Sequence, residues 1–314
     1  MGIGFILTSL LLLGDVGRLF VQAGYWLSGA RGAGEGLADP ARRLLFARSL
    51  AALVGTAGVG LSALGLREAL GALRVKELEV KLKGLPAALA GLRLVQISDV
   101  HVGPLLHQAW LTRVVETIGA LEPDVVVITG DLVDGSVAQL REHVAPLARL
   151  QHSAPRGVFF VTGNHDYYSG ADEWSAHLTT LGVRPLRNQR VEVAPGLDLA
   201  GIDDLTDPAS RSGANLTRAL AGRDPQRPVV LLAHQPKQFL QAAQLGVDLT
   251  LSGHTHGGQI FPFTWLVRLV QPFVAGLHRV GASQLYVSRG TGFWGPPLRL
   301  AAPAEITLLK LQPA

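Results

Sequence analysis

Five short apolar runs, each followed closely by a turn that carries histidine or aspartate, constrain the fold of this chain more than any other feature. Short β-branched runs are typical of strands that are buried on both faces of a sheet. Helical spacing of apolar residues appears between several runs, over 108–121 and from Pro236 to Leu245. Strands that alternate with helices predict a layered α/β domain. The runs and the polar residues after them are 92–97 with Asp99 and His101, 125–128 with Asp131, 158–161 with Asn164, His165 and Asp166, 229–233 with His234, and 249–251 with His254 and His256.

These polar turns predict one shared site, although more than 150 residues separate the first turn from the last. In open α/β sheets, sites form beyond the carboxyl ends of the strands, so distant turns can converge there. Glycine precedes Asp131, Asn164 and His254, which suits sharp turns out of the strands. The turns hold five of the ten histidines, and the chain has no cysteine that could supply a thiolate. Nitrogen and oxygen ligands gathered in this way are what a two-metal hydrolytic site needs.

Hydrolysis of a phosphate ester explains why such a site would use these residue types. The ester carries negative charge that repels hydroxide. Two cations about 3.5–4 Å apart neutralise that charge and lower the pKa of a water between them. The protein must then supply a carboxylate that bridges the metals, nitrogen and oxygen ligands on each side, and an acid for the leaving group.

The five turns, in this order, resemble those of the calcineurin-like metallophosphoesterases. The segments Gly253–Gln259 and Ser288–Gly290 resemble the bacterial membrane-associated branch of that family. The resemblance runs from about Leu78 to the C-terminus, and we assign 77–314 to the catalytic domain. It implies the calcineurin-like phosphoesterase fold, a layered β-sandwich flanked by helices. It also implies two divalent metal ions, for which Mn, Fe, Zn and Co are the candidates. Ligand type alone does not select among these four metals.

The same resemblance implies a role for each polar residue. His165 would lie over the phosphate as an acid or a phosphate contact, with Asp166 orienting its ring. Asp131 would bridge the two metals. The remaining metal ligands would be Asp99, His101 and His256 on one ion, and Asn164, His234 and His254 on the other.

Four further features allow two interpretations each. Asp134 is expected to cap a helix. Arg289 and Arg299 suit either a contact to substrate phosphate or a structural role. The apolar segment from Gln259 to Val270 is expected to form a helix packed into the core. The alternative is an exposed patch that touches lipid or accepts an apolar substrate tail.

Residues 1–76 differ from the rest and are predicted to anchor the chain in a membrane. The run 49–66 is uncharged and close to the minimum length of a transmembrane helix, which we favour over a buried core helix. A second apolar segment, 3–26, is a candidate membrane helix or a signal peptide, although it lacks a basic start. The stretch from Gly32 to Pro40 between them is predicted to be a loop.

The sequence gives conflicting signals about which side of the membrane holds the catalytic domain. A cytoplasmic loop is favoured by Arg31, Arg42, Arg43 and Arg48, and it would place the catalytic domain outside. The basic residues on the other flank, from Arg67 to Lys83, argue the opposite way. We expect an extracytoplasmic domain. The net charge of +4 suits an anionic substrate or membrane lipid, and no basic run interleaved with aromatics indicates nucleic acid. No protein partner is predicted.

The sequence therefore predicts a membrane-anchored, two-metal hydrolase of phosphomonoesters or phosphodiesters, with a lipid or envelope-linked phosphoester as the favoured substrate. A catalytically inactive metal-binding scaffold of the same fold is the alternative. Two other classes of metal hydrolase are disfavoured by their motifs. Metallo-β-lactamase sites require a His-x-His-x-Asp-His motif, which the chain lacks. Amidohydrolase barrels place His-x-His on the first strand, whereas His254 and His256 follow a late one.

Overall fold

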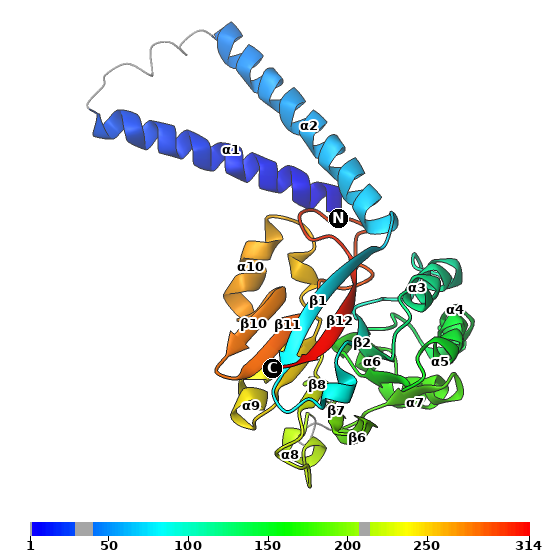
Figure 1. Cartoon of the computed structure of the whole chain (residues 1–314). Helices are drawn as coiled ribbons and strands as arrows, with labels where there is room; N and C mark the ends of the chain where they lie inside the picture. The colour runs from blue at the N-terminus through cyan, green and yellow to red at the C-terminus, as the bar shows by residue number, and fades with distance from the viewer. Residues whose placement is uncertain (1, 29–39, 207–213) are drawn as a thin grey trace.

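The computed structural model describes residues 2–28, 40–206 and 214–314. Two long helices extend from a body built on two sheets, and they diverge as they leave it (Figure 1). Both the N-terminal end of the first helix and the C-terminal end of the second lie against the body. The predicted loop from Gly32 to Pro40 falls mostly outside the described residues.

Each sheet in the described part of the chain has six strands. The first contains, in spatial order, β1 (Arg74–Leu82), β12 (Glu305–Pro313), β2 (Leu92–Ile97), β3 (Val125–Thr129), β4 (Val158–Val161) and β5 (Val183–Pro185). The second contains β10 (Gly276–Val280), β11 (Ser283–Val287), β9 (Leu249–Ser252), β8 (Val229–Leu232), β7 (Leu197–Gly201) and β6 (Gln189–Ala194). All five predicted strands are present, and β2 and β4 have the predicted bounds.

The central strands of both sheets run parallel, so their carboxyl ends meet at one edge. β2, β3, β4 and β5 pair in parallel, as do β7, β8, β9 and β11. The two sheets pack face to face over a shared apolar core that includes Leu94 and Val127 from one and Leu199 and Leu251 from the other. This is the predicted layered sandwich.

Helices cover the outer face of each sheet. On the first sheet lie α3 (Gln108–Ala120), α4 (Val137–Val144), α5 (Leu150–Ser153) and α7 (Ala171–Thr180), around a core that includes Val114 and Trp174. The second sheet packs against α8 (Leu216–Ala219) and α9 (Phe239–Gln244). The segment predicted as a helix from Pro236 begins as the 3-10 turn Pro236–Gln238 and continues as α9. The short helix α6 (Asn164–Tyr168) follows β4, and three further 3-10 turns span Ala87–Leu89, Ala145–Arg149 and His256–Gly258.

The two N-terminal helices are long, apolar and largely unburied. They are α1 (Gly2–Leu27) and α2 (Pro40–Leu70). Their candidate membrane spans have 23 and 31 residues. Each span contains an 18-residue window with a mean hydropathy of 1.7, and only 6% and 17% of these windows is buried. At 1.5 Å per residue, each span exceeds the roughly 30 Å of a bilayer core. A helix in a soluble core would be mostly buried, so that interpretation of 49–66 is wrong.

α2 is longer than the uncharged run that predicted it. It begins nine residues before Ser49 and ends four after Leu66, through Arg42, Arg43 and Arg67. Arginine is among the better helix formers, so these charges end the apolar stretch without ending the helix.

Close contacts join the helical arms to each other and to the body. Ile6 of α1 packs against Ile260 and Leu298 of the body. The backbone N–H of Arg299 donates a hydrogen bond to the carbonyl of Gly65 in α2, with 3.0 Å between nitrogen and oxygen.

The segment after the last histidine turn differs from the expected core helix. It forms α10 (Phe263–Val270), and none of its residues is buried. The expectation of a helix packed into the core is wrong. The structure instead places apolar side chains on the surface beside α1.

Candidate metal centre

Five of the seven predicted metal ligands have backbones in the left-handed region, where non-glycine residues are uncommon. Asp99, His101 and Asp131 have φ angles of 51°, 50° and 52°, and His254 and His256 have 70° and 50°. Strain of this kind persists only where the surroundings enforce it, and it clusters at functional sites. The turns therefore aim these side chains inward from the strand ends.

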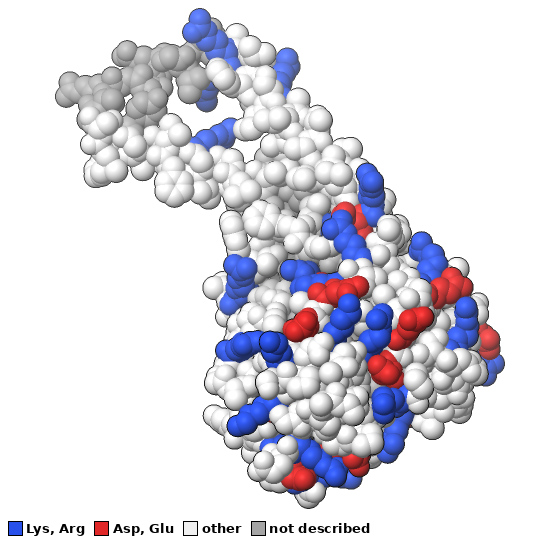
Figure 2. All heavy atoms as spheres, viewed as in Figure 1, with Lys and Arg blue, Asp and Glu red and all other residues white. Residues whose placement is uncertain are grey.

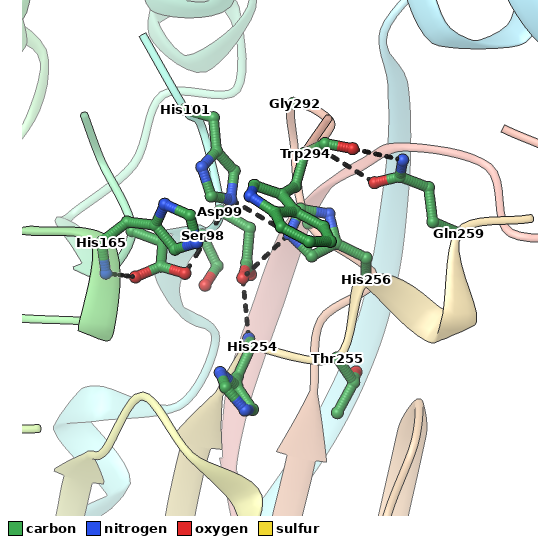
Figure 3. A network of polar contacts seen from close by, with 12 residues as sticks. Ser98, Asp99, His101, His165, His254, Thr255, His256, Gln259, Gly292 and Trp294 are labelled. Carbon is green, nitrogen blue, oxygen red and sulfur yellow. Dashed lines mark hydrogen bonds and ion pairs between the residues drawn. The ribbon is translucent and has the colours of Figure 1, made fainter. Parts of the chain in front are cut away.

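Two histidine rings and one carboxylate form the first cluster (Figure 3). Nε2 of His101 lies 3.1 Å from Nε2 of His256, which in turn lies 3.6 Å from Oδ1 of Asp99. The other carboxylate oxygen of Asp99 is buried without a hydrogen-bond partner among the described residues. Burial raises the pKa of Asp99. A cation between the facing nitrogen lone pairs and this buried carboxyl group would stabilise its charged form.

The second cluster lies beside the first and also combines nitrogen with oxygen. Nδ1 of His254 lies 2.9 Å from Oδ1 of Asn164 and 3.3 Å from Nε2 of His234. Nε2 of His234 is 3.3 Å from the same oxygen of Asn164. These three donors converge on one small volume.

Asp131 lies between the two clusters. Its Oδ2 is 3.3 Å from Nε2 of His234 and 3.9 Å from Nε2 of His101. One carboxylate oxygen therefore faces ligand atoms of both clusters, which is the position that a bridging ligand requires. This donor set is supplied by the seven residues that the sequence predicted, and its chemistry fits two divalent ions.

Hydrogen bonds behind the rings fix which nitrogen faces the site. Nδ1 of His101 lies 3.1 Å from both carboxylate oxygens of Asp134. Nδ1 of His234 donates to the carbonyl of Thr129 at 2.8 Å. Each bond engages Nδ1, so that Nε2 faces the cluster, as is usual for histidines that bind metal.

His165 lies at the mouth of the site, and its partner is not the predicted one. Nδ1 of its ring lies 2.7 Å from Oδ1 of Asp134. The carboxylate of Asp166 instead accepts backbone N–H groups of Gly163, Asp131 and Leu132, at 2.8 to 2.9 Å. The expectations that Asp166 orients the ring of His165 and that Asp134 caps a helix are therefore wrong. Asp166 holds the turns that carry Asp131 and Asn164 together.

The charges of the site set the protonation of its histidines and carboxylates. Burial opposes ionisation of Asp131, but the neighbouring His234 outweighs it and holds the pKa of Asp131 well below its usual range. Burial, with the charge of His234, lowers the pKa of His254 to about 4, and burial also lowers the pKa of His256. At neutral pH these residues are a carboxylate and two neutral rings, which are the forms that bind metal.

The pKa of His165 moves in the opposite direction. Burial disfavours the charged ring, but its hydrogen bond to Asp134 and the charge of Asp131 outweigh burial and raise the pKa. A raised pKa favours the protonated ring, which suits a proton donor or a phosphate contact.

Neither arginine is free to meet a phosphate. Arg289 pairs with Glu305 at 3.0 Å. The guanidinium of Arg299 is buried and donates to the carbonyls of Gly292 and Ala302 at 2.9 and 2.8 Å. The structural interpretation therefore fits both.

Sequence reasoning missed two aromatic residues at the site. Tyr168 and Trp294 line a cavity of about 350 Å³ together with His165 and the metal-ligand candidates. The ring of Trp294 lies 5.9 Å from that of His165 (Figure 3). Trp294 follows no strand and has no partner motif, so its sequence context carried no signal.

Comparisons with known proteins agree with this geometry. A family model described as calcineurin-like phosphoesterase matches residues 92–258. A transmembrane protein with metallophosphoesterase domain from Danio rerio is 40% identical over 323 residues, covering 98% of this chain and 71% of its own. An uncharacterized metallophosphoesterase from Helicobacter pylori is 40% identical over 252 residues, covering 79% and 66%. The relative from Danio rerio is named a transmembrane protein, and this chain has two long apolar helices among its described residues. Together these two findings indicate membrane association.

Solved structures are more distant. The crystal structure of a dimetal phosphatase from Danio rerio has 13% identity and a TM-score of 0.43, covering 66% of this chain and 90% of its own. The extent of the family match, the identity to the full-length relatives and the ordered ligand turns agree on one assignment. This chain belongs to the calcineurin-like metallophosphoesterase family.

Proposed function

We propose that this protein is a membrane-anchored phosphoesterase that hydrolyses phosphomonoesters or phosphodiesters at the centre around Asp131. The observation that carries the proposal is the position of Oδ2 of Asp131 between His234 and His101. When bound, two divalent cations would neutralise the phosphate oxygens and lower the pKa of the attacking water. Asp99, His101 and His256 would hold one of them, and Asn164, His234 and His254 the other.

The protein's own residues would complete the reaction. The oxygen of water bonds to phosphorus, and the bond from phosphorus to the ester oxygen breaks with its electron pair leaving on that oxygen. His165, whose pKa is raised, donates a proton to the leaving alcohol and is oriented by Asp134. Asp131 also accepts the backbone N–H of His165 at 2.8 Å, which ties the acid to the metal bridge.

Hydrolysis of an aryl phosphomonoester and an aryl phosphodiester by the full-length protein loaded with Mn tests this proposal. Three results together would support it. A chelator should abolish turnover, Asp131→Asn should lower turnover at least a hundredfold, and His165→Ala should lose turnover while retaining both metals. Glu142→Gln, an exposed change on α4, is the matched control. Two bound metals without turnover on any phosphoester would favour the inactive scaffold instead.

The arrangement of the helices supports an extracytoplasmic catalytic domain. α1 starts and α2 ends beside the body, so both spans would place the body on one side and Arg42, Arg43 and Arg48 on the other (Figure 1). Basic residues favour the cytoplasmic side. Because the chain has no cysteine, single substitutions Glu142→Cys and Pro40→Cys can be labelled with an impermeant maleimide in intact cells. Labelling of Pro40→Cys alone would reverse the proposed orientation.

A further inference from the structure

A second cavity lies directly beside the metal centre and is apolar. It has a volume of about 370 Å³, within the range of small-molecule pockets. His254 and His256 form one end of it, and the residues along it carry no Lys, Arg, Asp or Glu. Its apolar wall includes Ile260, Phe263, Val267, Val270, Trp294 and Pro296.

This cavity and the catalytic cavity share a boundary. His254, His256 and Trp294 line both. The backbone of Trp294 is held by the side chain of Gln259, which accepts its N–H at 2.9 Å and donates to its carbonyl at 2.7 Å (Figure 3). A molecule with its phosphate over the metal ligands would therefore have the apolar cavity next to its ester oxygen.

The other end of the cavity reaches the first membrane helix. Gly2 and Phe5 of α1 line it, and the ring of Phe5 lies 6.0 Å from that of Phe263 in an edge-to-face contact. A neighbouring groove of about 260 Å³ continues between α1 and α10, along Leu12 and Trp265. The apolar surface therefore runs without a charged lining residue from the metal ligands to the side of a candidate membrane span.

The exposure of α10 identifies the environment that covers it. Trp265, Leu269 and Val270 expose 55%, 81% and 76% of their surface. An apolar patch of this kind on a soluble surface would be costly, but beside α1 it can enter the bilayer interface. α1 carries the exposed ion pair of Arg18 with Asp15, and the rest of the visible arms in Figure 2 is mostly uncharged up to the arginines at their far end, which agrees with lipid around them.

We infer that the apolar cavity holds the hydrocarbon tail of a lipid phosphoester, which enters sideways from the bilayer between α1 and α10. This inference rests on the proposed function, because it places the ester phosphate at the metal centre. Trp294 packs against the first carbons of the tail, and Val267 against carbons farther from the phosphate. The substrate class is a phosphoester with at least one long acyl or prenyl chain.

Chain-length dependence tests the inference. The full-length protein in detergent is given phosphoesters with either an ethyl or a dodecyl chain, in the monoester or diester form that the aryl substrates show to be active. We expect kcat/KM to be at least tenfold higher for the dodecyl ester. Val267→Trp fills the cavity and should lower this dodecyl-to-ethyl ratio about tenfold. Leu269→Trp, on the same helix but outside the cavity, should leave the ratio unchanged.

The outcomes separate this inference from the proposed function. A wild-type protein that hydrolyses neither ester would contradict the function itself. Equal kcat/KM on both esters would overturn the tail site. An equal loss of the dodecyl-to-ethyl ratio in Val267→Trp and Leu269→Trp would also overturn it. Neither result would contradict the proposed phosphoesterase activity.

A binding measurement gives a second readout that does not need turnover. A long-chain alkyl phosphate with a diazirine at its end is photolysed with the protein. Labelling should concentrate in residues 258–271, fall when unlabelled dodecyl phosphate is added, and fall in Val267→Trp more than in Leu269→Trp. Labelling spread along α1 and α2 that dodecyl phosphate does not reduce would reject the site.

Discussion

Nδ1 of His165 and Oδ1 of Asp134 lie 2.7 Å apart, and the same carboxylate also meets Nδ1 of His101 at 3.1 Å. One carboxylate thus orients both the proposed acid and a metal-ligand candidate. Burial opposes its ionisation, but its hydrogen bonds to the two rings outweigh burial and lower the pKa of Asp134 to about 2. Asp134 is therefore ionised at any pH at which the protein would work.

Asp134→Asn should weaken the acid without removing it. The lost negative charge no longer raises the pKa of His165, so the protonated ring disappears at a lower pH. We expect the basic limb of the kcat profile to move to lower pH and kcat at neutral pH to fall about 10–100-fold. A pH–rate series with metal content measured in parallel checks this. An unchanged basic limb of the kcat profile would show that Asp134 does not set the pKa of His165.

Metal loading should stabilise the fold. Asp131 is a buried charge, Asp99 is a buried carboxyl group, and the nitrogens of His101 and His256 face each other. Bound cations would offset these unfavourable contacts. At a hundredfold excess over Kd, binding contributes about 2.7 kcal/mol, or a rise in Tm of about 5–10 °C. Differential scanning calorimetry with Mn and with chelator measures this rise. Asp131→Asn should lose most of it, and an undiminished rise would argue against the bridge.

Gly163→Ala should damage the centre through backbone packing. A Cβ at this position would lie 2.4 Å from the backbone nitrogen of Asp131 and against its carboxylate, so the bridge must shift. We expect bound metal to fall to half or less, as measured by elemental analysis. Gly55→Ala in α2, where a Cβ meets nothing within 4 Å, is the control. Equal metal content in the two variants would contradict the prediction.

Arg299→Met should unfold the protein more easily. The change leaves the buried carbonyls of Gly292 and Ala302 without donors, which costs about 3 kcal/mol of unfolding free energy. Urea denaturation followed by tryptophan fluorescence measures the loss. Arg149→Met removes an exposed pair with Glu116 at 3.4 Å and should cost less than about 1 kcal/mol. Similar losses of unfolding free energy in both variants would show that the buried hydrogen bonds of Arg299 do not stabilise the fold more than an exposed ion pair does.

The strands and the convergence of the ligand turns could be predicted because both follow from local pattern. The β-branched run of β3 is typical of a strand buried on both faces, and parallel strands bring their carboxyl ends together. The metal-binding roles of the residues in these turns remain predictions, and the measurements of metal content and of metal-dependent stability described above test them.

The partner of His165 could not be predicted, because it depends on the direction of a turn. Asp166 is the third residue of α6, and a carboxylate there bends back to the N–H of Gly163 at the start of the helix. That leaves Asp134, from a different turn, to meet the ring. The exposure of α10 was equally hidden, since apolar periodicity does not distinguish a face that meets protein from one that meets lipid.

The hydrogen bond from Arg299 to Gly65 has a consequence for how this molecule meets its substrate. Arg299 also donates to the carbonyl of Arg289 and lies 3.3 Å from Nδ1 of His256, so α2 is tied through one residue to a metal-ligand candidate. With α2 across a bilayer, the centre sits at a set height over one leaflet. For a substrate in that leaflet, encounter is a two-dimensional search, and its rate follows the surface density of the lipid rather than any bulk concentration.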